Sequence, residues 1–133
     1  MFRVRAFLTI LLAASALTVA ACGESEEDKA KSSVEDYLKA VENGDGDKAC
    51  GLVTAQTKKR IERSGRKCGE TISSLNQGPG KTLLTALKGA EVENVKVKGD
   101  TATAQIKLKG LTQTVDLQEE DGKWKLKSSA IAG

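Results

Sequence analysis

The sequence contains no histidine, and its one long apolar segment, residues 6–21, is shorter than the roughly 20 residues that a membrane-spanning helix requires. Histidine is a common general base near neutral pH and a frequent zinc ligand. Its absence therefore argues against a general-base catalytic site and against a zinc site. A cysteine nucleophile would lack its usual base, and a pair of thiols would lack the two further ligands that zinc needs. We therefore expect no metal site and no cofactor.

The chain also lacks a strong excess of charge. Its formal net charge is +3, but the first 21 residues hold two arginines and no acidic residue. Without that segment, 19 basic residues remain against 18 acidic ones, which is a net charge of +1. A nearly neutral domain gives no electrostatic reason to expect nucleic acid as a partner.

Residues 1–21 have the organisation of a secretory signal peptide: a short basic start, an apolar middle and small residues before a break. The sequence "VAAC" at residues 19–22 resembles the lipobox of bacterial lipoproteins. The resemblance implies that the Cys22 sulfur takes a diacylglyceryl group and that the chain is cut just before Cys22. Ordinary cleavage after Ala21 and an uncleaved anchor are the alternatives. Lipidation predicts a location at the extracytoplasmic face of the cell membrane.

The chain has three cysteines, Cys22, Cys50 and Cys68, which is an odd count for an exported protein. Lipidation of Cys22 would leave an even pair in an oxidising compartment. We therefore predict a disulfide between Cys50 and Cys68, with a metal-ligand pair or a reactive thiol as the alternatives.

Residues 22–31 are predicted to be the lipidated cysteine and a polar tether, because the sequence "GESEEDKAK" lacks apolar periodicity. Extended, residues 23–31 would reach about 30 Å from the membrane. Residues 32–133 are predicted to form one α+β domain.

The first half of this domain has helical periodicity. An apolar stripe of i, i+4, i+7 spacing predicts a first helix, with Ser33 and Asp36 as its cap and Asn43-Gly44 as its end. The stripe consists of Ala30, Val34, Tyr37, Leu38 and Val41. Shorter helical pieces are predicted around Cys50, toward Ile61, from Cys68 and around residues 83–87.

After Ala90 the period changes to two, as expected for strands with one buried face. Breaks at 99–100, 109–110 and 121–122 divide the segment into four strands. Tight turns there would place Ala104 opposite Val115 and Leu117 opposite Leu126, which keeps apolar residues on one face. The predicted fold class is α+β, with N-terminal helices packed on a C-terminal four-stranded antiparallel meander.

Three stretches in this order resemble the nuclear transport factor 2-like (NTF2-like), or cystatin-like, superfamily, and most of all its small actinobacterial lipoproteins. They are "VEDYLKAVENGDGDKACGLVT", "VKVKGDTATAQIKLKG" and "EEDGKWKLKS". The resemblance implies a curved sheet wrapped around helices, often with a conical pocket. This chain departs from the fuller pattern because it has no obvious strand pair between its helices.

Tyr37, Gln113 and Trp124 are the candidate residues for lining such a pocket. Tyr37 lies on the apolar stripe, and Gln113 is the polar residue of inward parity in its strand. No pair of carboxylates points inward by parity, so we identify no catalytic residue and expect a non-enzyme. The alternative is a small pocket enzyme of isomerase or hydrolase type.

The predicted sheet also carries an outward row of lysines, at positions 96, 98, 107, 109, 123, 125 and 127. This row is either a solvated face or a patch for anionic lipid headgroups and acidic wall polymers.

The function expected from the sequence is that of a lipid-anchored envelope protein. It would bind another envelope protein or a small apolar ligand.

Overall fold

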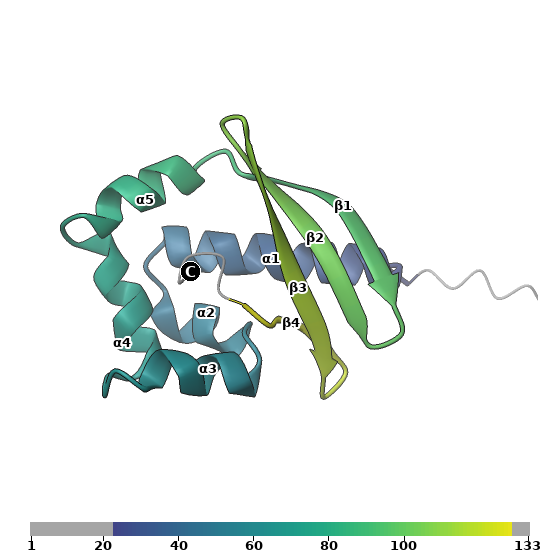
Figure 1. The fold of residues 1–133 in the computed structure, drawn as a ribbon, viewed down its shortest axis with the longest axis horizontal. Helices are drawn as coiled ribbons and strands as arrows, with labels where there is room; N and C mark the ends of the chain where they lie inside the picture. The colour runs from purple at the N-terminus through teal and green to yellow at the C-terminus, as the bar shows by residue number, and fades with distance from the viewer. Residues whose placement is uncertain (1–22, 129–133) are drawn as a thin grey trace, which may run out of the picture.

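The computed structural model describes residues 23–128 and places helices before a single sheet. Figure 1 shows α1 crossing behind the sheet, while the other helices gather toward the far end of α1. The helices are α1 (Glu26–Glu42), α2 (Gly46–Gly51), α3 (Ala55–Glu62), α4 (Cys68–Ser73), the short 3₁₀ helix η1 (Ser74–Asn76) and α5 (Gly80–Leu87). The strands are β1 (Glu91–Lys98), β2 (Thr101–Leu108), β3 (Leu111–Glu120) and β4 (Lys123–Leu126).

Helix α1 starts earlier than the sequence analysis predicted. Ser25 is its N-cap: the Ser25 hydroxyl accepts a hydrogen bond from the Asp28 backbone N–H and donates one to the Asp28 carboxylate. The predicted cap at Ser33 is wrong, and residues 26–31 belong to the helix rather than to a tether. Only residues 23–25 of the predicted tether precede the folded domain. The apolar stripe itself is confirmed, since all five of its residues are buried.

The small helices α2 and α4 pack closely, and a disulfide joins them. Asp45 caps α2 by accepting a hydrogen bond from the Lys48 backbone N–H. A side chain at Gly46 would meet the backbone oxygen of Gly69, so glycine permits this close approach. Cys50 of α2 is bonded to Cys68 of α4. The predicted disulfide is therefore confirmed.

The sheet is an antiparallel meander with strand order β1-β2-β3-β4. The predicted pairs are confirmed, because Ala104 lies opposite Val115 and Leu117 lies opposite Leu126. Strand β1 contains an irregularity between Glu93 and Lys96 that the alternation did not predict. Of the predicted outward lysines, Lys109 lies instead in the turn between β2 and β3, at a positive φ of 37°.

The core lies between α1 and the inner face of the sheet. The buried α1 stripe packs with apolar side chains that point inward from all four strands. Those inward side chains are Val92, Ala102, Ala104, Ile106, Val115, Leu117, Trp124 and Leu126.

None of the helices within residues 23–128 is long and apolar enough to cross a membrane. The predicted α+β arrangement is confirmed.

Tyr37, the single tyrosine, gives the core a measurable pH dependence. Burial raises the pKa of its hydroxyl to about 12. In the unfolded chain the hydroxyl ionises near pH 10, so between about pH 10 and pH 12 the unfolded state loses the proton first. We expect the free energy of unfolding to fall by about 2 to 3 kcal/mol across this range.

The comparison of wild type with Tyr37→Phe isolates this loss from the titration of the lysines. Denaturant unfolding of both proteins at several pH values would measure it, and tyrosinate absorbance of the folded protein would follow the same group. A folded-state midpoint near pH 10 would contradict the burial of this hydroxyl.

Candidate functional site

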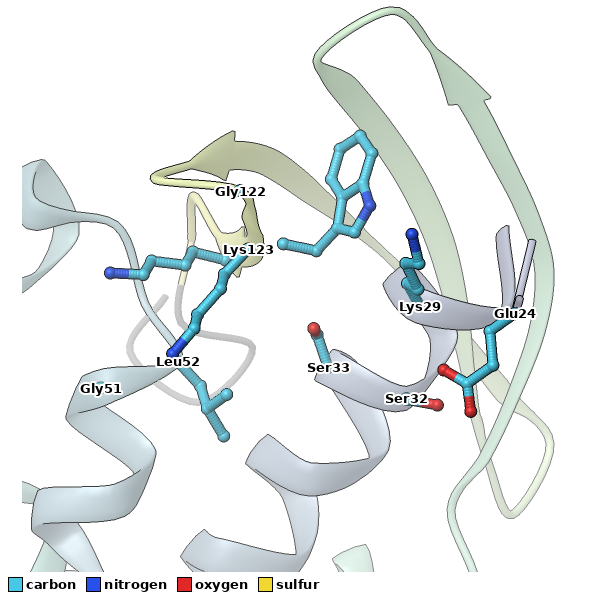
Figure 2. A pocket seen from close by; sticks show the side chains of 10 residues that line it. Glu24, Lys29, Ser32, Ser33, Gly51, Leu52, Gly122 and Lys123 are labelled. Carbon is cyan, nitrogen blue, oxygen red and sulfur yellow. The ribbon is translucent and has the colours of Figure 1, made fainter. Parts of the chain in front are cut away.

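A pocket of about 250 Å³ opens beside the first turns of α1, between that helix, the end of α2 and the β3–β4 hairpin. Figure 2 shows Leu52 and Lys123 on one side of it and Lys29 and Glu24 on the other. The complete lining consists of Glu24, Lys29, Ser32, Ser33, Gly51, Leu52, Gly122, Lys123, Trp124 and Lys125. The pocket therefore combines apolar surface with lysine and serine hydrogen-bond donors.

Trp124 ties the hairpin to the start of α1. The turn at Asp121-Gly122 returns the chain into β4, where Trp124 faces the core and is 3% exposed. The indole Nε1–H donates to Glu26 Oε2 at 2.9 Å. Lys29 donates to the other carboxylate oxygen of Glu26 at 2.7 Å. This chain of contacts fixes the wall of the pocket that α1 contributes.

The same contacts set the ionisation of the two charged groups. The hydrogen bond from Lys29, followed by that from Trp124, lowers the pKa of the Glu26 carboxyl. The carboxylate of Glu26 in turn raises the pKa of the Lys29 ammonium. Both groups are thus held in their charged forms at neutral pH, so this part of the wall carries fixed charges.

The opposite wall is held by a short backbone pairing that the sequence did not reveal. Leu126 N–H donates to the Leu52 carbonyl at 2.8 Å, and Thr54 N–H donates to the Leu126 carbonyl at 2.9 Å. Buried Thr57 adds a hydrogen bond from its hydroxyl to the Lys127 carbonyl. The segment 52–54 therefore acts as a short parallel neighbour of β4 and brings Leu52 to the pocket.

Of the three predicted lining residues, only Trp124 lines this pocket. Trp124 lines the pocket, Tyr37 is 1% exposed within the core and is not part of the lining, and Gln113 is exposed. Gln113 has inward parity and lies opposite buried Ile106, but it is itself solvent-exposed. The prediction of a shared pocket is wrong for Tyr37 and Gln113.

The lining residue Lys29 was missed because residues 23–31 were interpreted as a tether, and Ser33 was missed because it was assigned to the helix cap. A signal for the earlier helix was present: Ser25 followed three residues later by Asp28 is a capping pattern, and Glu26 and Lys29 have helical i, i+3 spacing. Leu52 had no comparable signal, because its place depends on backbone hydrogen bonds to β4.

The predicted cysteine sites have separate outcomes. Cys50 and Cys68 form the disulfide, and Cys22 lies outside the described residues. Within residues 23–128 no group of three or more potential metal-ligating side chains comes together.

The comparisons identify the class of the fold. No family model and no curated protein matches the sequence. Helices followed by a four-stranded antiparallel sheet form an α+β fold that is similar to the fold of an NTF2-like protein. A similar solved structure is that of a Campylobacter jejuni protein proposed to be an NTF2-like transpeptidase. It is 17% identical, with a TM-score of 0.50 over 80% of this chain and 100% of that chain.

A de novo designed protein with a curved β-sheet is 15% identical, with a TM-score of 0.39 over 80% of this chain and 89% of that chain. Identities this low carry no inference about transpeptidase chemistry.

Proposed function

We propose that this protein is a lipid-anchored envelope protein whose NTF2-like domain binds a ligand or partner without catalysing a reaction. Acylation at Cys22 would anchor it to the extracytoplasmic face of the cell membrane. The observation that carries the proposal is the Cys50–Cys68 disulfide. It accounts for two of the three cysteines and leaves Cys22, at the end of the lipobox-like sequence, as the odd one.

The start of α1 supports a short distance between anchor and domain. Three residues separate Cys22 from Glu26, the first residue of the helix. At about 3.5 Å per residue, the connection from Cys22 to Glu26 spans at most about 14 Å. The pocket, whose lining includes Glu24, would therefore lie close to the membrane surface.

The pocket lining supports a binding role. Leu52 and Trp124 supply apolar surface, while Lys29, Lys123 and Ser33 supply hydrogen-bond donors. A small ligand with an apolar body and an acidic group fits this combination. Glu24 is the one carboxylate of the lining, so the pocket lacks the pair of acids that a hydrolase of the glycosidase type requires. Such a ligand, or a second envelope protein, is the proposed partner class.

Cys22→Ala tests the anchor. We expect the variant to leave the membrane fraction or to accumulate with its leader attached, because alanine has no thiol to acylate. Fractionation of cells that express wild type and variant would measure this. Cys50→Ala is the matched control, since it removes a different cysteine and should leave membrane association intact. Unchanged membrane association of Cys22→Ala would contradict the proposal.

A further inference from the structure

Arginine and lysine are distributed differently along this chain. After position 22 the chain has three arginines, and all of them lie in the seven residues 60–66. The basic segment, residues 58–67, is defined by six exposed cations: Lys58, Lys59, Arg60, Arg63, Arg66 and Lys67. We propose that this basic segment binds a phosphodiester polymer outside the bilayer.

The basic segment holds one acidic residue against six cations. Glu62 is the one acidic residue within the segment, and its Oε1 accepts a hydrogen bond from the Cys68 backbone N–H at 3.3 Å. That contact serves the first turn of α4, whose N-cap Lys67 makes no side-chain cap bond. In the part of the chain that the structure describes, none of the six cations forms an ion pair within 4.0 Å.

The fold holds these cations on a fixed surface. Helix α3 begins at the Thr54 cap, and buried Thr57 connects it to the backbone after β4. At the other end, Cys68 follows Lys67 directly and is bonded to Cys50 of α2. Arg60 in the last turn of α3 and Arg63 at its C-cap are three positions apart in helical backbone and therefore share one side. Binding would order few additional backbone residues, which favours affinity.

The arginines indicate the chemistry of the partner. A guanidinium group is planar, always charged and matches the oxygens of a phosphate with two parallel hydrogen bonds, whereas an ammonium group acts as a point charge. Elsewhere in residues 22–133 the chain uses only lysine for positive charge. A repeating phosphodiester presents several phosphates to several such groups at once, so binding would be strong at low salt and weak at high salt.

The position of the basic segment favours a polymer over the bilayer itself. In Figure 1, α1 begins on the right beside the sheet, and α3 with its loop to α4 lies at the lower left. The start of α1 is acidic, with Glu26, Glu27 and Asp28 in its first turn. This step rests on the proposed anchor at Cys22: the acidic end would then lie near the membrane, and the basic end would point away from it.

Binding of the full chain to poly(glycerol phosphate) in solution tests the proposal. We expect the triple variant Arg60→Gln, Arg63→Gln, Arg66→Gln to bind about tenfold or more weakly than wild type at low salt, because three phosphate contacts are lost. The triple Arg→Lys variant keeps the charge and is expected to bind with intermediate affinity. All six side chains are exposed, so circular dichroism and thermal melting of the variants should match wild type.

The matched control removes the same charge from another exposed surface, through Lys96→Gln, Lys98→Gln and Lys127→Gln on the outer side of the sheet. It should bind within about twofold of wild type if the site is local rather than a property of net charge. Equal losses in both triple variants, or absence of wild-type binding, would overturn the proposal. Tighter binding of the unacylated Cys22→Ala protein to phosphatidylglycerol vesicles, or of wild type to double-stranded DNA, at equal phosphate concentration would also overturn it. Because the polymer and the DNA are soluble and the vesicle measurement uses the Cys22→Ala protein, these outcomes are independent of whether Cys22 is acylated.

Discussion

Trp124→Ala is expected to lower the free energy of unfolding by about 3 to 5 kcal/mol. The indole is 3% exposed and belongs to the buried cluster, so its removal leaves a cavity that the surrounding side chains fill only in part. The substitution also removes the hydrogen bond to Glu26, the tie between β4 and the first turn of α1. Urea unfolding followed by far-ultraviolet circular dichroism would measure the loss, since Trp124 is the chain's one tryptophan.

Two further variants separate packing from hydrogen bonding. Trp124→Phe retains a ring but lacks the indole N–H, so we expect a smaller loss than for alanine. Glu26→Gln leaves the indole in place and keeps an oxygen acceptor, so its effect should be smaller still. A loss below about 1.5 kcal/mol for Trp124→Ala would place the ring outside the core, contrary to the burial described above.

Removal of the disulfide is expected to cost about 3 kcal/mol. Cys50 and Cys68 are 18 residues apart, and opening this loop restores conformational freedom to the unfolded chain. Because small domains are stable by only about 5 to 15 kcal/mol, the double variant Cys50→Ser, Cys68→Ser would lose a large share of its stability. Chemical denaturation of the variant and of wild type under non-reducing conditions would measure this.

The single variants provide the control. Cys50→Ser and Cys68→Ser should each lose nearly as much as the double variant, since either one opens the same cross-link. Cys22→Ala should leave the stability of the domain unchanged, because Cys22 takes no part in the disulfide. Alkylation of Cys50 and Cys68 in native, non-reduced protein would contradict the cross-link.

The sheet could be predicted in detail because strand alternation and tight turns both constrain register. Gly110 and Gly122, each at positive φ, mark two of the turns, and the alternation then leaves one register that buries apolar residues. The pairing of Leu117 with Leu126 follows from the turn position and the strand alternation alone. The irregularity in β1 could not be predicted this way, because Asn94 at a φ of 50° interrupts the alternation without a glycine.

The start of α1 was harder to predict because its first turn buries no apolar side chain. Residues 26–29 are polar and make local contacts, with Ser25 as cap and Lys29 paired to Glu26. Helical periodicity detects buried stripes, so it placed the start one to two turns too late. The decisive contact, from Trp124 to Glu26, joins residues 98 positions apart and leaves no local signal.

The candidate pocket was predictable only in part for the same reason. Parity in a strand predicts which face a side chain occupies, and it placed Trp124 correctly on the inner face. Parity does not predict which part of the inner face other elements cover. Gln113 was therefore assigned to a cavity, although its side chain is exposed to solvent. Leu52 reaches the pocket through backbone pairing with Leu126, which no side-chain pattern encodes.

The intact mass of the protein extracted from the membranes of expressing cells tests the central claim most directly. The account predicts a chain that begins at Cys22, carries a diacylglyceryl group on that residue and retains the Cys50–Cys68 disulfide. Fragmentation of the N-terminal peptide would place the lipid on the Cys22 sulfur. A chain that still begins at Met1, or one that begins at Cys22 without a lipid, would contradict the account.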